Sequence, residues 1–340
     1  MNEEYFYEVI KDKVIDWSEI VINLFEHCNM SCVFCPQDHS NKTGLSREAI
    51  LRKVGPVVDY INKNPYKEFH LHIMGGELFQ DELINQGYIE IYSEFIDEIK
   101  QHVNTDKKLL FNFITNLVYE NVDDVISFAD KHNLKLTISY DLAGRFNAAQ
   151  FDLYKINVEK FKPYIKYVSL VITKQNITKL LQGDPYHDYL YDNFTMTWDH
   201  LLPGHNSLKV MMPSESELYS FYTTLIDKYP NTVNVEAFVG SAPNNKMSCT
   251  RGSSFTILFD DTIPKGCSGS VLMRNNSTKD LESTVIIQKF IKERDCFGCE
   301  YYQKCGFSCF IRSDYKDLVR DLDDCVFRKS FKYFELKLEK

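Results

Sequence analysis

The stretch HCNMSCVFC at residues 27–35 decides how this chain is interpreted. It places Cys28, Cys32 and Cys35 at C-x3-C-x2-C spacing, directly after the apolar run EIVINLF at Glu19–Phe25. Three thiolates on one short loop can hold three corners of an iron–sulfur cube and leave the fourth iron without a protein ligand. Such an iron is open to direct binding of a substrate or cofactor.

A zinc site is the simpler alternative for these three thiols. A structural zinc ion takes four ligands, usually with C-x2-C spacing, and the trio matches that pattern poorly. A cluster of three cysteines without any metal is a weaker interpretation still, because free cysteines seldom gather on one loop. The spacing therefore favours an iron–sulfur cluster over zinc.

Composition and charge exclude several classes of protein. The chain has 340 residues, 44% of them hydrophobic, and a formal net charge of −9. It has no basic block, which makes non-specific phosphate binding unfavourable. No apolar stretch is long enough for a membrane span, and the acidic start MNEEYFYEVIK lacks the features of a signal peptide. We therefore expect a cytoplasmic protein, in whose reducing compartment clustered thiols are metal ligands before they are disulfides.

Short apolar runs alternate with helical patterns as far as about residue 240, as a parallel α/β fold requires. The runs are Glu19–Phe25, Phe69–Met74, Leu109–Ile114, Leu134–Ser139, Tyr167–Ile172 and, more weakly, Phe194–Trp198. Most lack strict alternation, which predicts strands covered on both faces. Helical stripes lie between them, as at Leu51–Ile61 behind a candidate cap at Ser46. Periodicity alone does not choose between an open barrel and a doubly wound sheet.

The pattern changes at the turn-rich stretch SAPNNK, Ser241–Lys246, beyond which cysteines become dense. Phe255–Phe259 and Ile263–Gly266 flank a turn and predict a hairpin. We expect two domains, at residues 1–240 and 241–340. The second is expected to be stapled by metal, because so short a segment has little core of its own.

The first cysteine motif resembles the signature of the radical S-adenosylmethionine superfamily, C-x3-C-x-(aromatic)-C, with Phe34 in the aromatic position. Gly75-Gly76-Glu77 ends the second predicted strand, where members of that superfamily carry a Gly-Gly-Glu that contacts the methionine amino group of the cofactor. The resemblance covers about the first 240 residues. It implies an α/β fold, a partial (β/α)6 TIM-like barrel, with S-adenosylmethionine bound to a [4Fe–4S] cluster on Cys28, Cys32 and Cys35.

Polar residues follow the third and fourth predicted strands, where α/β barrels collect their active-site groups. By the resemblance, Asn116 and Ser139 contact the ribose and methionine carboxylate of the cofactor, and Asp141 contacts the substrate. Arg145, on a loop over the barrel mouth, is a candidate to hold an anionic substrate group. Helix capping and a solvated surface Arg are the alternative interpretations of these residues.

The resemblance also implies the chemistry. A reduced cluster passes one electron to the sulfonium of S-adenosylmethionine, and the resulting 5′-deoxyadenosyl radical removes a hydrogen atom from the substrate. The cofactor carries the difficult step, while the protein positions it and excludes water. A flavodoxin- or ferredoxin-type protein is the expected electron donor.

Seven cysteines between residues 249 and 325 resemble the SPASM extension of this superfamily, which holds auxiliary [4Fe–4S] clusters. By that resemblance Cys296, Cys299, Cys305 and Cys325 hold an outer cluster, and Cys249, Cys267 and Cys309 hold an inner one. Thr262 stands where the family has a Gly, and Ser268 stands where sulfatase-maturing relatives have an Asp. The inner set lacks a fourth thiolate, so a non-thiolate group completes it or an iron faces the substrate. Three [4Fe–4S] clusters are implied in all, whereas zinc would leave seven cysteines one short of two sites.

SPASM proteins mostly modify peptides, so the leading hypothesis is a radical enzyme acting on a ribosomally made peptide or protein side chain. Crosslinking, thioether formation, epimerisation and oxidation all remain open. A small-molecule oxidoreductase that dehydrogenates a sugar or aminoglycoside is the second hypothesis. A non-catalytic iron–sulfur carrier or a zinc-stabilised binding protein is the third, although a carrier needs no cofactor pocket. Neither nucleic acid nor a membrane is expected as a partner.

Overall fold

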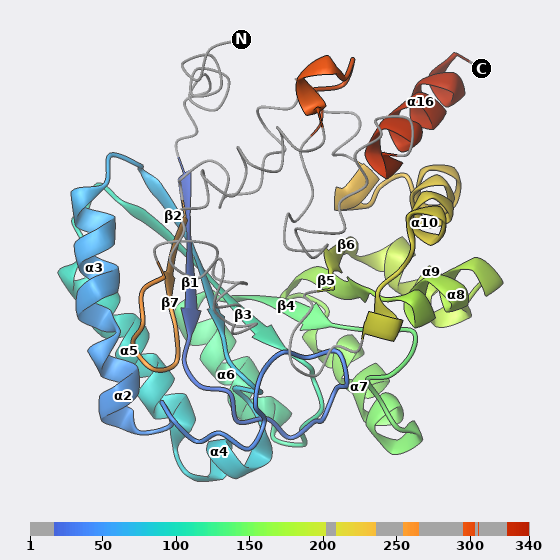
Figure 1. The fold of residues 1–340 in the computed structure, drawn as a ribbon. Helices are drawn as coiled ribbons and strands as arrows, with labels where there is room; N and C mark the ends of the chain where they lie inside the picture. Colours follow the sequence, from blue (N-terminus) through green and yellow to red (C-terminus); the bar gives the residue numbers. More distant parts are fainter. Residues whose placement is uncertain are drawn as a thin grey trace.

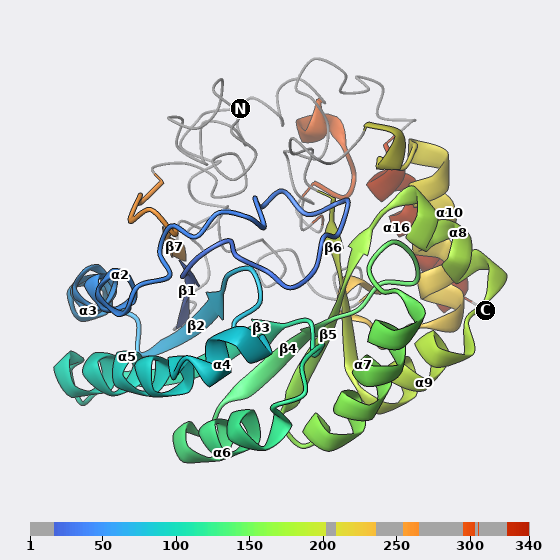
Figure 2. The same cartoon turned by 90° about the horizontal axis from the view of Figure 1, so that it is seen from below.

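The computed structural model describes residues 17–201, 209–235, 254–264, 295–302, 305 and 325–339. These residues form a seven-stranded sheet in the order β6-β5-β4-β3-β2-β1-β7, and every neighbouring pair is parallel. The strands are β1 (Trp17–Asn23), β2 (Glu68–Met74), β3 (Lys108–Thr115), β4 (Lys135–Ser139), β5 (Ile165–Ile172), β6 (Thr195–His200) and β7 (Ser254–Ile257). The sheet curls into a half-barrel with helices on its convex side (Figures 1 and 2). The predicted partial TIM-like barrel is confirmed.

All six strands predicted within the barrel are present, with ends that differ by one or two residues. Their exposure differs from the prediction, because burial alternates along β1 and β2. In β2, Phe69, Leu71 and Ile73 are fully buried against helices, whereas His70 and His72 are half-buried on the concave face. Among the described residues, helices cover the convex face of these two strands, and the alternating burial differs from the prediction of strands buried on both faces.

Helices connect successive strands on the outside of the curl. They are α2 (Arg47–Arg52), α3 (Val54–Lys63), α4 (Asp81–Asn85), α5 (Tyr88–His102), α6 (Val122–His132), α7 (Ala148–Phe161), α8 (Lys174–Gln182), α9 (Pro185–Asn193) and α10 (Glu215–Lys228). The stripe at Leu51–Ile61 spans two helices, because the first ends at Arg52 and Lys53 separates it from α3. Ser46 caps α2 as predicted, accepting the Ala49 amide at 3.1 Å. No helix among these residues is long and apolar enough to cross a membrane.

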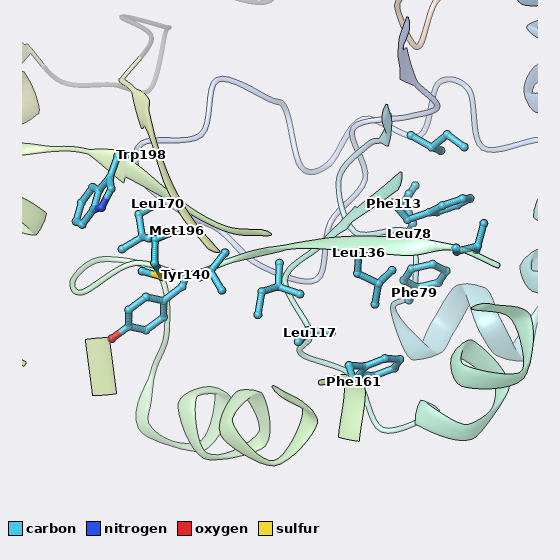
Figure 3. Packing of buried hydrophobic residues seen from close by; sticks show 14 of the residues in the cluster. Leu78, Phe79, Phe113, Leu117, Leu136, Tyr140, Phe161, Leu170, Met196 and Trp198 are labelled. Atoms are coloured by element: carbon cyan, nitrogen blue, oxygen red, sulfur yellow. The ribbon is translucent and has the colours of Figure 1, made fainter. Parts of the chain in front are cut away.

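The core lies between the convex face of the sheet and its helices (Figure 3). Phe113 of β3 stacks on Phe79 with ring centroids 5.6 Å apart, and meets Phe128 of α6 edge-on at 5.4 Å. At the β6 edge of the sheet, Trp198 packs edge-on against Phe221 of α10, with ring centroids 5.0 Å apart. Aromatic pairs in these geometries add about 0.5–1.5 kcal/mol beyond their area burial. The rigid wall they form fixes the strand ends that carry the site.

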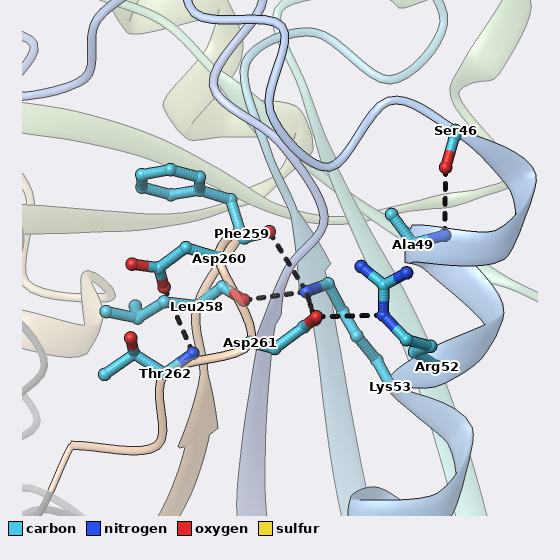
Figure 4. A network of polar contacts seen from close by, with 9 residues as sticks. All are labelled: Ser46, Ala49, Arg52, Lys53, Leu258, Phe259, Asp260, Asp261 and Thr262. Carbon is cyan, nitrogen blue, oxygen red and sulfur yellow. Dashed lines mark hydrogen bonds and ion pairs between the residues drawn. The ribbon is translucent and has the colours of Figure 1, made fainter.

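β7 lies in the barrel sheet, a pairing that the sequence does not predict, and the second arm of the predicted hairpin, Ile263–Gly266, lies partly outside the described residues. It pairs in parallel with β1, with Ile257 opposite Ile22, and the tight turn after it does not lead into a second strand within the described residues. Lys53, whose side chain is fully buried, donates to the carbonyls of Leu258 and Phe259 at 2.8 and 3.3 Å (Figure 4). It also pairs with Asp261 at 2.6 Å, which Arg52 joins at 3.1 Å. This network fixes the end of β7 to the helices that follow the cysteine loop.

Two later segments are described, a 3-10 turn η2 (Cys296–Gly298) and the helix α16 (Val326–Leu338). α16 lies alongside α10 (Figure 1), where Tyr333 and Lys337 contact Asp227 at 2.5 and 2.8 Å. The Ser241–Lys246 linker lies outside the described residues. The division into domains at residue 240 stays a prediction, with the addition that β7 belongs to the barrel sheet.

Candidate active site

The three N-terminal cysteines lie on the loop between β1 and α2, which crosses the concave side of the sheet toward β6 (Figure 2). The Cys35 amide donates to the Cys32 carbonyl at 3.1 Å, and the Met30 amide donates to the Cys28 sulfur at 3.4 Å. Cys32 is 8% exposed. Burial raises the pKa of the Cys28 thiol to about 12 and that of Cys35 to about 11. A metal bound here would have to displace their protons.

The Gly75-Gly76 turn at the end of β2 is clamped to the start of the cysteine loop. The Gly76 amide donates to the Phe25 carbonyl at 2.8 Å, and the Glu77 amide donates to the His27 carbonyl at 3.1 Å. A Cβ on Gly76 would lie 1.8 Å from the His27 carbonyl oxygen. Glycine is therefore required for the two backbones to meet, and it leaves backbone rather than side chain facing the loop.

The Glu77 carboxylate faces the protein interior and is fully buried. One oxygen accepts from the Phe79 amide at 3.0 Å and the Thr115 hydroxyl at 2.8 Å, and the other accepts from the Asn116 amide at 2.6 Å. Burial raises the pKa of Glu77 to about 7 in spite of these three donors. The carboxylate thus ties the end of β2 to the end of β3, and it does not line the cavity described below.

Asn116 connects the link between β2 and β3 to the cysteine loop. Its side-chain nitrogen, Nδ2, donates to the side-chain oxygen of Asn29 at 2.9 Å and lies 4.0 Å from the Cys28 sulfur. Asn29 in turn donates to the Val118 carbonyl at 2.6 Å. The loop after β3 therefore positions Cys28 through two amide side chains that are adjacent in space and far apart in sequence.

Asp141 and Arg145 form an ion pair beside the thiols. Arg145 Nε donates to Asp141 at 2.6 Å, and the guanidinium lies 5.2 Å from the centroid of the Phe34 ring. Asp141 is buried and also accepts from the Val171 amide and from Asn176, at 2.9 and 2.5 Å. Burial alone would lower the pKa of Arg145, but the charges of Asp141 and Cys32 raise it. Arg145 is thus a fixed cation facing the cysteine loop, rather than a solvated surface side chain.

A cavity of about 410 Å³ joins most of the predicted site residues, within the range of pockets that enclose small ligands. The predicted residues that line it are Cys28, Cys32, Phe34, Cys35, Gly75, Gly76, Asn116, Ser139 and Arg145. Two predicted site residues, Glu77 and Asp141, do not line the cavity. They instead hold Asn116 and Arg145, which do.

The cavity also has lining residues that the sequence reasoning missed. Asp199, His200 and Leu201 line it from the end of β6. The sixth strand predicted from the sequence ends at Trp198, one residue before this group. The rule that barrel strands carry site residues at their C-terminal ends points to Asp199 once β6 is extended to His200.

Four of the C-terminal cysteines are described, and they come from one region. Cys296 is the first residue of η2 and Cys299 follows its end, where the Cys299 amide donates to the Cys296 carbonyl at 3.1 Å. Cys325 precedes α16. Tyr301 stacks on Phe331 of α16 with centroids 4.9 Å apart, which brings that helix against the turn. Cys305, the fourth, is half-buried like the others. Cys249, Cys267 and Cys309, and with them the predicted inner cluster, lie outside the described residues.

The donor groups fit an iron–sulfur cluster better than a zinc ion. A structural zinc ion takes four ligands, usually with C-x2-C spacing, whereas the cysteine loop brings three thiols to the cavity at C-x3-C-x2-C spacing. The seven described cysteines form no disulfide with one another. Three desolvated thiols around one cavity, with a fixed cation beside them, suit a cluster whose thiolates each bind a different iron.

Comparison with known proteins establishes the fold. No protein-family model matches the sequence, and no curated protein matches it. Among solved structures, native anSMEcpe with bound AdoMet and Cp18Cys peptide is 16% identical, with a TM-score of 0.68 over 95% of this chain and 98% of that one. SuiB of Streptococcus suis bound to its precursor peptide SuiA is 13% identical, with a TM-score of 0.56 over 95% of this chain and 79% of that one. The chain has the fold of radical S-adenosylmethionine enzymes, as the resemblance predicted.

Proposed function

We propose that this chain is a radical S-adenosylmethionine enzyme with its cluster on Cys28, Cys32 and Cys35. The observation that carries the proposal is the single cavity lined by all three thiols, the Gly-Gly turn and the ends of β3 and β4. When bound, a [4Fe–4S] cluster and S-adenosylmethionine would supply the electron transfer and the 5′-deoxyadenosyl radical that removes a hydrogen atom from the substrate. The fold shared with AdoMet-bound anSMEcpe supports this proposal.

The chain's own residues would bind and orient these groups. Gly75 and Gly76 offer backbone to the ligand at close range, because neither carries a side chain. Arg145 supplies a positive charge beside the thiolates and can also attract the carboxylate of a cofactor, since only its Nε is held by Asp141. Asn116 and Ser139 present polar groups from two strand ends. Phe34 packs against Arg145 and helps to keep water from the guanidinium.

We propose a peptide or protein side chain as the substrate. Both structurally similar proteins named above have been solved with peptides bound, and each shares its fold with nearly the whole of this chain. Cys296, Cys299, Cys305 and Cys325 would hold an outer auxiliary cluster, with Cys249, Cys267 and Cys309 on an inner one. The reductant would be a flavodoxin- or ferredoxin-type protein.

The test is reductive cleavage of the cofactor. Anaerobically reconstituted protein should approach about 12 iron atoms per chain, in three clusters of four. With dithionite and S-adenosylmethionine it should release 5′-deoxyadenosine, detected by mass spectrometry, without any added peptide. Tightly bound zinc without visible cluster absorbance, or intact S-adenosylmethionine after prolonged incubation, would contradict the proposal.

A further inference from the structure

The cavity has a second side, formed by β6, that the cysteine motif and the Gly-Gly turn do not reach. β6 is at one edge of the sheet, and four strands separate it from β1. The curl of the half-barrel nevertheless brings Asp199 of β6 to the same cavity as the cysteine loop (Figure 2). The cofactor proposed above belongs to the cysteine side, so the β6 side is available to a substrate.

Asp199 is an exposed residue of the cavity lining, and within the described residues one hydrogen bond holds its carboxylate. Ser169 of the neighbouring strand β5 donates its hydroxyl to Asp199 Oδ2 at 2.5 Å. Among the residues that the structure describes, no Lys or Arg pairs with this carboxylate. Desolvation by the surrounding barrel wall raises its pKa, although the Ser169 hydrogen bond opposes the shift. A carboxylate in such surroundings is stabilised most by a cation or by strong hydrogen-bond donors.

The other charges of the cavity lining do not neutralise Asp199. Arg145 is the one Lys or Arg in the described lining, and it lies on the cysteine side of the cavity, where its Nε donates to Asp141 at 2.6 Å. His200, next to Asp199 in sequence, meets the Tyr222 hydroxyl at 3.2 Å. Three thiolates would add further negative charge on the opposite side. Among the described lining residues, Asp199 is therefore left able to pair with a positively charged ligand.

Resting on the proposed function, we propose that Asp199 binds the cationic group of the substrate, the ammonium of a lysine or the guanidinium of an arginine. The ion pair forms at the end of β6 and holds the substrate side chain across the cavity from the cysteine loop. Ser169 keeps the carboxylate turned toward that group. The substrate class is thus a peptide with a basic residue at or beside the modified position.

The test compares two blocked peptides that differ only in charge, Ac-Gly-Lys-Gly-NH2 and its norleucine analogue. Binding is measured by calorimetry to anaerobically reconstituted protein that is saturated with S-adenosylmethionine. The lysine peptide should bind at least tenfold more tightly than the norleucine peptide. Asp199→Asn should remove this preference, whereas Asp192→Asn, which deletes the same charge from the exposed end of α9, should keep it.

Several outcomes overturn the assignment. They are equal affinities for the two peptides, no measurable binding of the lysine peptide, and a lysine preference that survives Asp199→Asn. A tenfold loss of S-adenosylmethionine affinity in Asp199→Asn would place the carboxylate on the cofactor instead. If Asp199→Asn does not fold, Ser169→Ala replaces it and should reduce the lysine preference at least threefold; an unchanged preference counts against the proposal. Failure of the radical function is seen separately, as absence of 5′-deoxyadenosine from wild-type protein without peptide.

Discussion

The two groups of cysteines that the structure describes are held by different scaffolds. Cys28, Cys32 and Cys35 lie on a loop tied to the ends of β2 and β3, behind which lies the aromatic core of the half-barrel. Cys299 and Cys325 lie at a 3-10 turn and at the start of α16, where one stacked pair of rings and surface ion pairs join the two. The first scaffold thus joins the ends of two strands of the sheet, whereas the described part of the second joins a short turn to one helix.

The difference indicates what each site is built to do. The first group lines a cavity beside the buried cation of Arg145. The second group has charged residues beside it that reach solvent, such as Glu300 at 43% side-chain exposure. A site that generates a radical needs a dry, fixed pocket, whereas a structural or electron-relay cluster does not. We therefore propose that catalysis belongs to the first group alone.

The largest expected effect is on cofactor cleavage. Replacing Cys28, Cys32 and Cys35 together by alanine should abolish 5′-deoxyadenosine formation and remove about a third of the iron. Replacing Cys299 and Cys325 by alanine should also remove about a third of the iron but leave peptide-independent cleavage. Iron analysis and mass spectrometry of the two variants measure both effects. Loss of cleavage in both variants would end the functional distinction between the groups.

The next effect concerns the scaffold of the first group. Glu77→Gln should cost about 2–3 kcal/mol of unfolding free energy, because an amide N–H₂ would face the Asn116 N–H that now donates to the carboxylate. Urea unfolding measures the loss, with the exposed Glu90→Gln as the matched control. A stability equal to that of the control would mean that Glu77 does not tie β2 to β3.

The strands and the cysteine loop could be predicted from the sequence because their signals are local. The direction of the Glu77 side chain could not, since the donors that turn it inward come from Thr115 and Asn116 on the next strand. The sequence-based expectation that this carboxylate contacts the cofactor stays untested, but its three protein donors indicate a positioning role.

The pairing of β7 with β1 could not be predicted for a similar reason. The turn at Asp260–Thr262 is typical of a hairpin, and Asp261 does adopt a left-handed φ of 66°. Pairing with β1, far away in the sequence, decides the fold there, together with the buried Lys53. Local turn chemistry therefore predicts the turn but not the pairing of β7 with β1.

A smaller effect is expected where β7 meets the helices. Lys53→Met should cost about 1–2 kcal/mol, because two carbonyls lose their donor while water still reaches the partly exposed Asp261. Lys63→Met, at an exposed position, is the control for loss of charge. Equal unfolding midpoints of the two variants would show that the Lys53 network does not hold β7 to the barrel.

The smallest effect is expected at the second scaffold. Arg328→Ala removes the ion pair with Glu300 at 3.0 Å, which should contribute about 0–1 kcal/mol at this exposed position. The Glu300 backbone N–H and then Arg328 lower the pKa of Glu300 to about 2. Any stability from this carboxylate is therefore present above its ordinary pKa and is lost as the pH falls toward 2. A pH titration of unfolding should show a weaker acid loss in Arg328→Ala, and a cost as large as that of Glu77→Gln would contradict the comparison.

Electron paramagnetic resonance of the reduced protein tests the central assignment most directly. The Cys299→Ala, Cys325→Ala variant is reconstituted and reduced, and spectra are recorded with and without S-adenosylmethionine. The account predicts that the cofactor shifts a [4Fe–4S]⁺ signal in this variant, and that the shift is absent when Cys28, Cys32 and Cys35 are replaced. A signal indifferent to S-adenosylmethionine, or a shift that survives loss of the three N-terminal cysteines, would contradict the claim that they hold the open-iron cluster.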